Sequence, residues 1–597
     1  MNILYVITVL ALYVLCMLIH KTEEKKNAIT WVAITTIALL CYNIFICVVL
    51  SFVNIKSTLL NLSICNIIVG VLLAVVLIKT KKFQKYYVKI IDVIFLVILL
   101  ALVIFIAYKQ YGFPFKIKYE TTDGSTHYYY AEQFYKTSEL LYKGKNNDIF
   151  GLYDSDFRLP GAYINEGILF KIFDKVTLKV DLFILFDLFI LYLSGILFYY
   201  LLKDCIFKEN KKLEILAMVF AVMYMCGYQL NVMIYGSIYL SLALALIIVF
   251  FLIMSRYEKD KLPSIISLPI LSLLSFGIFF SYAYFIPVIY IAIITNLIVK
   301  TIMNKEKLFS EENLTYLFCL VIIPLILGLT FFIILPSASD IDNEIVTATL
   351  PGLIYTNYIS NFIAFSPIFV VGIEVLIRNK KKEINFSQIL LVLNILFIIL
   401  LFILNKFGKV SEYYCFKAYF LLWPLVIYNT YIMICHIAED NNKTLKLGTY
   451  VYILIYIIVI IFSTFIIKKD RGINNIFIHN VERIQDEREI LKRGELEILK
   501  RVKTTLNNNQ IYVLNSKLEG RVKWLSVLYN KNFIWLDTIN GYEITIPKWL
   551  KERDKKYYIG YYFDYDKTVE KAPNLDRHSK KYEILYEDEF GFILERK

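Results

Sequence analysis

The sequence predicts a mainly α-helical, polytopic transmembrane bundle with a small α/β domain after its last membrane span. Of the 597 residues, 58% are hydrophobic and only 19% are charged, whereas soluble domains carry about 25% charged residues. Apolar runs of roughly 20 residues recur along the chain, and each is long enough to cross a bilayer as a helix. Only residues 468–597 form a long polar region in which short strand-like and helix-like patterns alternate.

Fourteen apolar segments are predicted to span the membrane. The first has no basic residues before its apolar run and no clear cleavage site, so we expect a retained helix rather than a signal peptide. The boundaries at residues 231–234 and at Ser281 mark either tight hairpins or kinked re-entrant pairs. The predicted spans are residues 2–20, 29–53, 58–78, 90–108, 180–202, 213–230, 235–254, 264–280, 282–300, 314–335, 357–377, 385–404, 413–436 and 447–467.

Basic residues are distributed unequally between alternate loops. One set of loops holds 24 Lys and Arg residues, whereas the short loops of the other set hold only Lys56, Lys406 and Lys409. Because basic loops stay in the cytoplasm, the first set is predicted to be cytoplasmic, and both termini and residues 468–597 to be extracytoplasmic. The basic loops are residues 21–27, 79–89, 203–212, 255–263, 300–307, 378–382 and 437–446.

Charge and cysteine content exclude two classes of function. The net charge of +13 comes mostly from these loops, so it indicates membrane orientation rather than nucleic-acid binding. Of the nine cysteines, only Cys205 lies outside the apolar segments, in a basic loop. The sequence therefore supports neither a disulfide framework nor a cysteine zinc site.

The chain divides into four predicted regions. Accessory spans occupy residues 1–89, a transmembrane module with a long external loop at 109–178 occupies 90–335, further spans occupy 336–467, and an α/β domain occupies 468–597. In the last region an amphipathic helix is expected from His479, and Pro547 marks the start of a later one. We interpret this domain as a lid or docking domain. Its predicted strands are residues 511–514, 532–536, 556–563, 582–587 and 590–596.

The external loop carries a polar stretch, Thr121 to Tyr135, between long apolar runs. A turn is predicted at Asp123, followed by a helix from Ser125 that ends at Gly144. Residues 164–173 are predicted to form a second helix. It is too short to span the membrane, and we expect it at the interface with Lys171 on its polar face.

Asp123 is the first candidate catalytic residue. It stands just ahead of a helix N-terminus, where Asp is a favoured cap. A carboxylate held by backbone donors also stays ionised, which a general base requires, and the two roles are compatible. His127, one turn later, either assists Asp123 or packs against the neighbouring tyrosines.

Basic residues at the outer face are candidates for binding a phosphate. Arg158 offers a planar fork that suits phosphate. Lys417 lies near the outer end of a predicted span, where an ionisable residue is either functional or snorkels to the interface. Asp156 and Tyr128 complete the candidate substrate-binding set.

Three motifs resemble those of the GT-C superfamily of membrane glycosyltransferases. DGSTHYYYAEQF resembles the family's acidic start of the first external loop, FRLPGAY its approach to the second loop helix, and EYYCFKAYFLL its late Tyr-rich segment with a Lys. The resemblance covers the fourth to tenth spans. It implies sugar transfer from a polyprenyl-phosphate carrier, with Asp123 as the catalytic acidic residue and Arg158 and Lys417 near the carrier phosphate. Gly124 stands where many members have a second acid, so we expect no metal or other cofactor.

The predicted function is therefore a hexosyl or pentosyl transferase that acts on a cell-envelope glycan, glycolipid or protein. A sugar transferase outside the membrane requires a lipid-carried donor, because nucleotide sugars are cytoplasmic. The alternatives are a flippase for lipid-linked oligosaccharides and a non-catalytic subunit of envelope assembly. A flippase would more typically show internal repeats and intramembrane charges.

Overall fold

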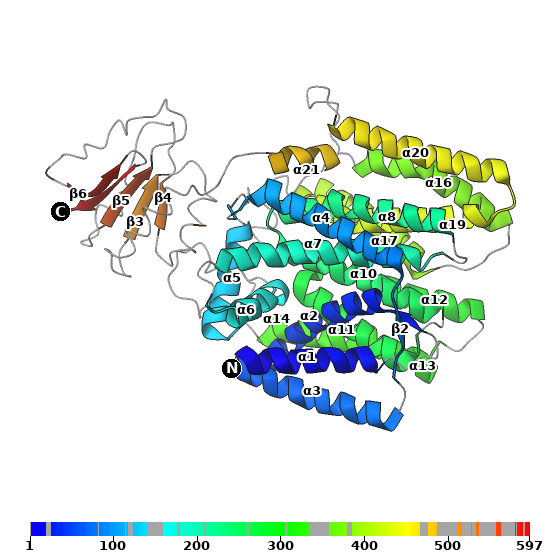
Figure 1. The fold of residues 1–597 in the computed structure, drawn as a ribbon, viewed down its shortest axis with the longest axis horizontal. Coiled ribbons are helices and arrows are strands. Elements are labelled where there is room, and N and C mark those ends of the chain that lie inside the picture. Colours follow the sequence, from blue (N-terminus) through cyan, green and yellow to red (C-terminus); the bar gives the residue numbers. More distant parts are fainter. Residues whose placement is uncertain are drawn as a thin grey trace.

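The structure is a computed structural model and describes residues 2–19, 25–80, 83–113, 115–117, 123–140, 159–175, 179–206, 210–259, 262–304, 308–334, 358–378, 385–465, 476–485, 511–515, 524, 527, 533–536, 557–562, 580, 582–588 and 591–597. Helices dominate these residues and run side by side in one elongated bundle (Figure 1). Ten helical stretches in this part of the chain are long and apolar enough to cross a membrane. The predicted fold class, a polytopic helical bundle followed by a small α/β unit, is confirmed.

Each of the fourteen predicted spans coincides with one or more helices. The helices, with their π-helical (η1, η3) and 3-10 (η2) interruptions, are α1 (Asn2–Leu18), α2 (Ala28–Phe52), α3 (Leu59–Thr80), α4 (Ile90–Tyr111), α7 (Lys179–Lys203), α8 (Lys211–Tyr224), η1 (Met225–Gln229), α9 (Leu230–Ile234), α10 (Ile238–Glu258), α11 (Ser264–Tyr282), η2 (Ala283–Phe285), α12 (Ile286–Asn304), α13 (Glu311–Leu317), η3 (Phe318–Ile322), α14 (Ile323–Ile334), α16 (Tyr358–Arg378), α17 (Phe386–Lys406), α18 (Glu412–Lys417), α19 (Tyr419–Glu439) and α20 (Lys443–Phe465).

Both uncertain span boundaries are hairpins. Between α9 and α10 the chain turns at Gly236, whose φ of 69° favours glycine. Arg256 near the end of α10 then reaches Asp204, just before α8, at 2.6 Å. Around η2, the chain reverses between α11 and α12. Lys300 of α12 pairs with Glu258, beside the start of α11, at 3.1 Å.

Buried and partly buried ion pairs join the helices at the end of the bundle that carries the basic loops. Asp92 of α4 bonds Lys203 of α7 at 2.5 Å and Tyr199 at 3.0 Å. The amide of Asn27, in the short strand β1 (Lys26–Asn27), also donates to Asp92, and β1 pairs with β2 (Tyr86–Tyr87). We call this region, with the Asp204–Arg256 and Glu258–Lys300 pairs, the ionic end.

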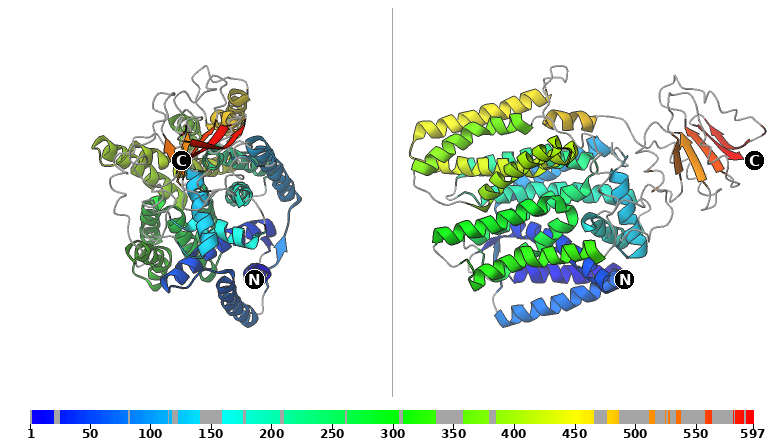
Figure 2. Two further views of the ribbon diagram at one scale, coloured as in Figure 1. Left: turned by 90° about the vertical axis from the view of Figure 1, so that its left-hand side faces the viewer. Right: turned by 180° about the vertical axis from the view of Figure 1, so that it is seen from behind.

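Two short helices close the opposite end of the bundle. They are α5 (Asp123–Thr137) and α6 (Gly161–Ile172), and α1 begins beside them (Figures 1 and 2). The side chain of Asn2 donates to the backbone oxygen of Lys171 at 3.0 Å. We call this region the loop-helix end.

The expected position of the second loop helix is wrong. All but two residues of α6 are buried, because it packs against α5, α2, α7, α10 and α11 rather than along an interface. Lys171 is itself buried, and its amine donates to Ser57 O at 3.0 Å and Ser138 Oγ at 2.8 Å. Hydrogen bonds to these loop groups replace the water that the sequence pattern predicted around the amine.

The C-terminal region contains the five predicted strands. They form one sheet in the order β4-β3-β5-β7-β6, beyond the loop-helix end in Figures 1 and 2. The strand β3 is parallel to β4 and β5, whereas β7 is antiparallel to β5 and β6. The strands are β3 (Ile511–Asn515), β4 (Phe533–Leu536), β5 (Tyr557–Tyr562), β6 (Tyr582–Asp588) and β7 (Gly591–Arg596).

A helix connects this sheet to the bundle. It is α21 (Ile476–Gln485), and it contacts α20, α4, η1 and α9. The amphipathic helix expected from His479 is therefore present over its first turns, and its remainder lies outside the described residues. The division of the chain into four regions remains a prediction.

Candidate functional site

The helix α5 carries three of the candidate site residues, Asp123, His127 and Tyr128. Its tyrosine-rich stripe packs on α6, where the rings of Tyr130 and Tyr163 stack with centroids 5.5 Å apart. Gly167 of α6 allows this close approach, since a Cβ there would lie 2.6 Å from the Phe134 ring and 2.9 Å from Ala131 O. Asp123 is the first residue of α5, one turn before His127. Its side chain lies outside the described part.

His127 is buried against the start of α10. Its side chain is 3% exposed, and its ring centroid lies 4.5 Å from that of Tyr239. Tyr239 is the second residue of α10, immediately after the turn at Gly236. The hairpin between α9 and α10 therefore presents Tyr239 to α5.

Lys417 also contacts Tyr239. It is the last residue of α18, and its amine donates to the Tyr239 hydroxyl at 3.0 Å. The amine also lies 5.4 Å from the ring centroids of Tyr239 and Tyr282, which is cation–π range. Lys417 is only 4% exposed, so it does not snorkel to the surface. His127, Tyr239, Tyr282 and Lys417 form what we call the lysine cluster.

Four segments distant in sequence supply the lysine cluster. Tyr282 ends α11 at the hairpin around η2, and its ring contacts Tyr284 at 5.6 Å. Tyr284 in turn donates to the backbone oxygen of Tyr414, on the same short helix as Lys417, at 2.5 Å. Sequence reasoning missed Tyr239 and Tyr282, because nothing in the local sequence distinguishes them among 47 tyrosines.

Tyr128 belongs to a separate aromatic cluster. Its ring contacts Phe170 at 5.8 Å, Phe183 at 5.7 Å and Trp524 of the C-terminal region at 5.7 Å. Burial raises the pKa of the Tyr128 hydroxyl well above 10, and the nearby Glu132 and Asp181 raise it further. This residue connects the C-terminal region to the helix that carries His127.

The other predicted site residues are not placed by the structure. Arg158 and Asp156 lie outside the described residues. Within the described ranges, no group of three His, Cys, Asp or Glu side chains is arranged to hold a metal ion. The lysine cluster thus joins two of the predicted residues, His127 and Lys417, through Tyr239.

A buried acidic pair lies near the same end and was not predicted. Glu166 of α6 and Asp187 of α7 are both 0% exposed. Among the residues that the structure describes, neither carboxyl oxygen of Glu166 has a hydrogen-bond partner. Burial raises the pKa of the Glu166 carboxyl well above its ordinary value of 4.5, and the charge of Asp187 raises it further. The only local signal was an acid within the apolar run INEGILF.

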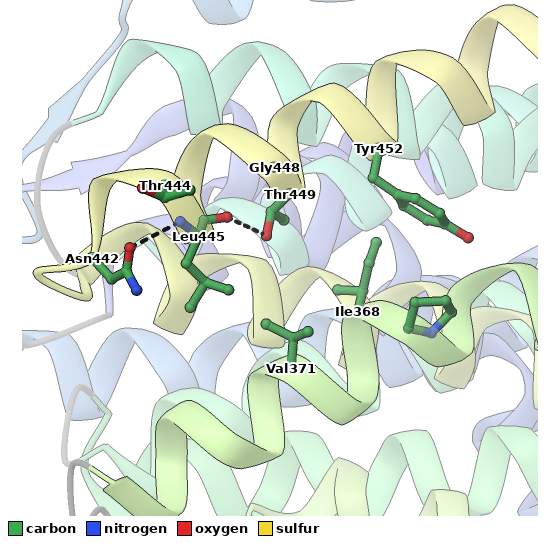
Figure 3. A pocket seen from close by; sticks show the side chains of 9 residues that line it. Ile368, Val371, Asn442, Thr444, Leu445, Gly448, Thr449 and Tyr452 are labelled. Atoms are coloured by element: carbon green, nitrogen blue, oxygen red, sulfur yellow. Dashed lines mark hydrogen bonds between the residues drawn. The ribbon is translucent and has the colours of Figure 1, made fainter.

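A cavity of about 380 Å³ lies elsewhere in the bundle, between α16 and α20 (Figure 3). Its polar side chains bond to their own helix, as Asn442 accepts from Leu445 N at 3.1 Å and Thr449 donates to Leu445 O at 2.9 Å. No residue of the lysine cluster lines it. It is therefore distinct from the candidate site.

Comparison with known proteins gives one structural likeness. No protein-family model and no curated protein sequence matches the chain. Among solved structures, the fold is similar to the crystal structure of ArnT from Cupriavidus metallidurans in the apo state, with a TM-score of 0.43 and 9% sequence identity. The match covers 84% of this chain and 97% of ArnT. At this level the likeness concerns the general arrangement of helices, and no functional argument rests on it.

Proposed function

We propose that the chain is a membrane glycosyltransferase of the GT-C type. It transfers a sugar from a polyprenyl-phosphate carrier to an extracytoplasmic acceptor, which is a cell-envelope glycan, a glycolipid or a protein. The observation that carries this proposal is the lysine cluster: a buried amine held by Tyr239 beside His127, four residues after Asp123. Sugar transfer from a phosphate carrier needs a base for the acceptor and a cation for the phosphate, and the proposal assigns these roles to Asp123 and Lys417.

The proposed chemistry assigns one task to each side chain. The acceptor hydroxyl loses its proton to Asp123 and attacks the anomeric carbon of the sugar. The bond from that carbon to the carrier phosphate breaks, and the phosphate leaves with the electron pair. Lys417 stabilises the negative charge that develops on the phosphate. Tyr239 holds the amine, and the neighbouring aromatic rings offer apolar faces to the sugar.

Two expectations from the sequence fit this proposal. Charge asymmetry predicts the loop-helix end to be extracytoplasmic, where the carrier phosphate would lie at the membrane surface. Arg158 and Asp156 follow α5 in the same loop and remain candidates for contacts with the donor. Tyr128, the remaining candidate, packs beside Trp524 of the C-terminal region.

The test is Asp123→Asn in membranes supplied with labelled polyprenyl-phosphate sugars. Asn has nearly the size of Asp and is equally favoured at helix N-termini, so this change removes the base with little effect on the start of α5. We expect transfer to fall about 10²–10⁴-fold at unchanged thermal stability. Glu132→Gln, on the same helix, is the matched control and should transfer normally.

Two results would reject the proposal. Transfer by folded Asp123→Asn at the wild-type rate would remove Asp123 from the mechanism. Lipid translocation by the wild type, without transfer from any carrier tried, would favour the flippase.

A further inference from the structure

The helix that leads to Tyr239 is interrupted in its middle. Between α8 and α9 lies the π-helical turn η1, in which Gly227 has non-helical dihedral angles. Leu230 N–H donates to Gly227 O and Met225 O, rather than to Cys226 O four residues earlier. Trp423 of α19 packs into the interruption, since a Cβ on Gly227 would lie 2.9 Å from the indole nitrogen. Such π turns commonly occur at functional sites.

A residue from the C-terminal helix α21 fills this interruption. Asn480 donates to Cys226 O at 2.7 Å and to Gly227 O at 2.8 Å, and it accepts from Asn231 at 2.7 Å. Asn480 is 1% exposed and Asn231 is fully buried. The side chain therefore bonds both sides of the broken helix from a position some 250 residues away in sequence.

The same helix contacts both segments that lead to the lysine cluster. His479 Nε2 and the Tyr235 hydroxyl are hydrogen-bonded at 3.1 Å, and Tyr235 lies four residues before Tyr239, across the turn at Gly236. Phe477 packs on Trp423 with centroids 6.4 Å apart, on the helix that follows Lys417. The segment before Tyr239 and the helix after Lys417 thus both contact one short helix.

We propose that Asn480 is a positioning residue for the lysine cluster, and that α21 couples the C-terminal region to the candidate site through it. Asn480 fixes the interrupted helix, which fixes the hairpin that carries Tyr239. A C-terminal region that shifts α21 would then loosen Tyr239 and, through Trp423, the Lys417 segment. The coupling to catalysis rests on the proposed function, whereas the coupling between α21 and residues 228–241 does not.

The experiment measures the full-length chain in two ways. Hydrogen–deuterium exchange reports the local effect of Asn480→Ala on residues 228–241, and steady-state kinetics report the KM for the donor and kcat separately. Because three buried hydrogen bonds are lost, exchange in this segment should rise about tenfold or more, with α2 and α3 unchanged. The KM for the donor should rise more than kcat falls, since the cluster that binds the phosphate is displaced rather than removed.

Three further variants sharpen the test. Asn480→Asp keeps the size of the side chain but cannot donate to the two carbonyls, so it should behave like Asn480→Ala. Gln485→Ala removes an exposed amide from the same helix and should behave like wild type. If Asn480→Ala does not fold, His479→Phe removes the bonds of His479 to Tyr235 and Arg483 but keeps those of Asn480. It should show a smaller rise in exchange over the same segment.

The outcomes separate the two proposals. The coupling would be overturned if folded Asn480→Ala and His479→Phe both exchanged residues 228–241 at the wild-type rate, whatever their activity. A uniform rise in exchange over the whole bundle would also overturn it, because it indicates a purely structural role. A local rise in exchange in a protein that transfers no sugar would leave the coupling standing and reject the proposed function.

Discussion

The two ends of the bundle bury charged side chains in different ways. At the ionic end, oppositely charged groups bond each other: Asp92 with Lys203 at 2.5 Å, and Asp204 with Arg256 at 2.6 Å. At the loop-helix end, the contacts of Lys417 include a tyrosine hydroxyl and two aromatic rings. Glu166 of the same end faces a like charge, that of Asp187.

This difference distinguishes charged side chains that stabilise the fold from charged side chains that are expected to serve activity. A buried ion pair is destabilising to break, because one charge is left uncompensated. It adds little net stability, because the desolvation of both charges offsets their attraction. A buried carboxyl that faces a like charge, as Glu166 faces Asp187, disfavours folding and is retained where it serves a function. The ionic end is therefore expected to control stability, and the loop-helix end to control activity.

The largest change in stability is expected from Lys203→Met at the ionic end. The substitution leaves Asp92 buried with only its hydrogen bonds from Asn27 and Tyr199. We expect a loss of about 3–5 kcal/mol of unfolding free energy, measured by denaturant unfolding in detergent. Adding Asp92→Asn to this variant should recover most of the loss, because the second charge is then also gone.

An exposed ion pair at the opposite end provides the matched control. Lys56 and Glu139 are 3.1 Å apart, and their side chains are 61% and 42% exposed. Lys56→Met should cost less than about 1 kcal/mol, because solvent screens the pair. Equal losses for Lys56→Met and Lys203→Met would contradict the special role of the ionic end.

The second prediction concerns Lys417→Met at the loop-helix end. Removal of the buried amine should lower sugar transfer about 10²–10³-fold, as loss of a group that stabilises developing charge does. Thermal unfolding of the same preparation confirms that the variant is folded. Tyr239→Phe, which removes only the hydroxyl that accepts from Lys417, should reduce transfer about tenfold. Wild-type transfer by Lys417→Met would show that the lysine is structural.

The sequence predicts the bundle well and the site only partly. Spans and strands follow from periodicity and length, which local sequence records directly. The lysine cluster joins Lys417 to Tyr239 across 178 positions, and no periodic pattern records such a contact. The buried state of α6 was missed for a similar reason. Its short amphipathic pattern fits an interface, and only the surrounding helices show that Lys171 is enclosed.

The third prediction uses pH to test the acidic pair. Since the pKa of Glu166 is raised in the folded state, the folded protein binds the proton more tightly than the unfolded chain. Stability contributed by this group is therefore lost as pH rises above 4.5 towards the folded pKa. Glu166→Gln, which mimics the neutral acid, should become more stable relative to wild type by up to about 1.4 kcal/mol per pH unit.

Thermal unfolding of both proteins between pH 5 and 8 measures this difference. Glu139→Gln changes an exposed carboxylate near the same end and should follow the wild-type profile. A constant difference between Glu166→Gln and wild type over this range would show that Glu166 is ionised in the folded protein.

The smallest effect is expected for Lys171, which also lies at the loop-helix end. Burial lowers the pKa of its amine from 10.5 to about 8. The folded protein therefore binds fewer protons than the unfolded chain between these two values, and stability rises with pH across that window. The amine can donate to Ser57 O and Ser138 Oγ in either protonation state, so the change in protonation alone sets the effect. Relative to Lys171→Met, wild type should gain about 1 kcal/mol per pH unit from pH 8 upwards, measured by unfolding in detergent. If wild type instead loses stability relative to the variant as pH rises, the fold stabilises the charged amine of Lys171. The loop-helix end would then stabilise buried charge as the ionic end does.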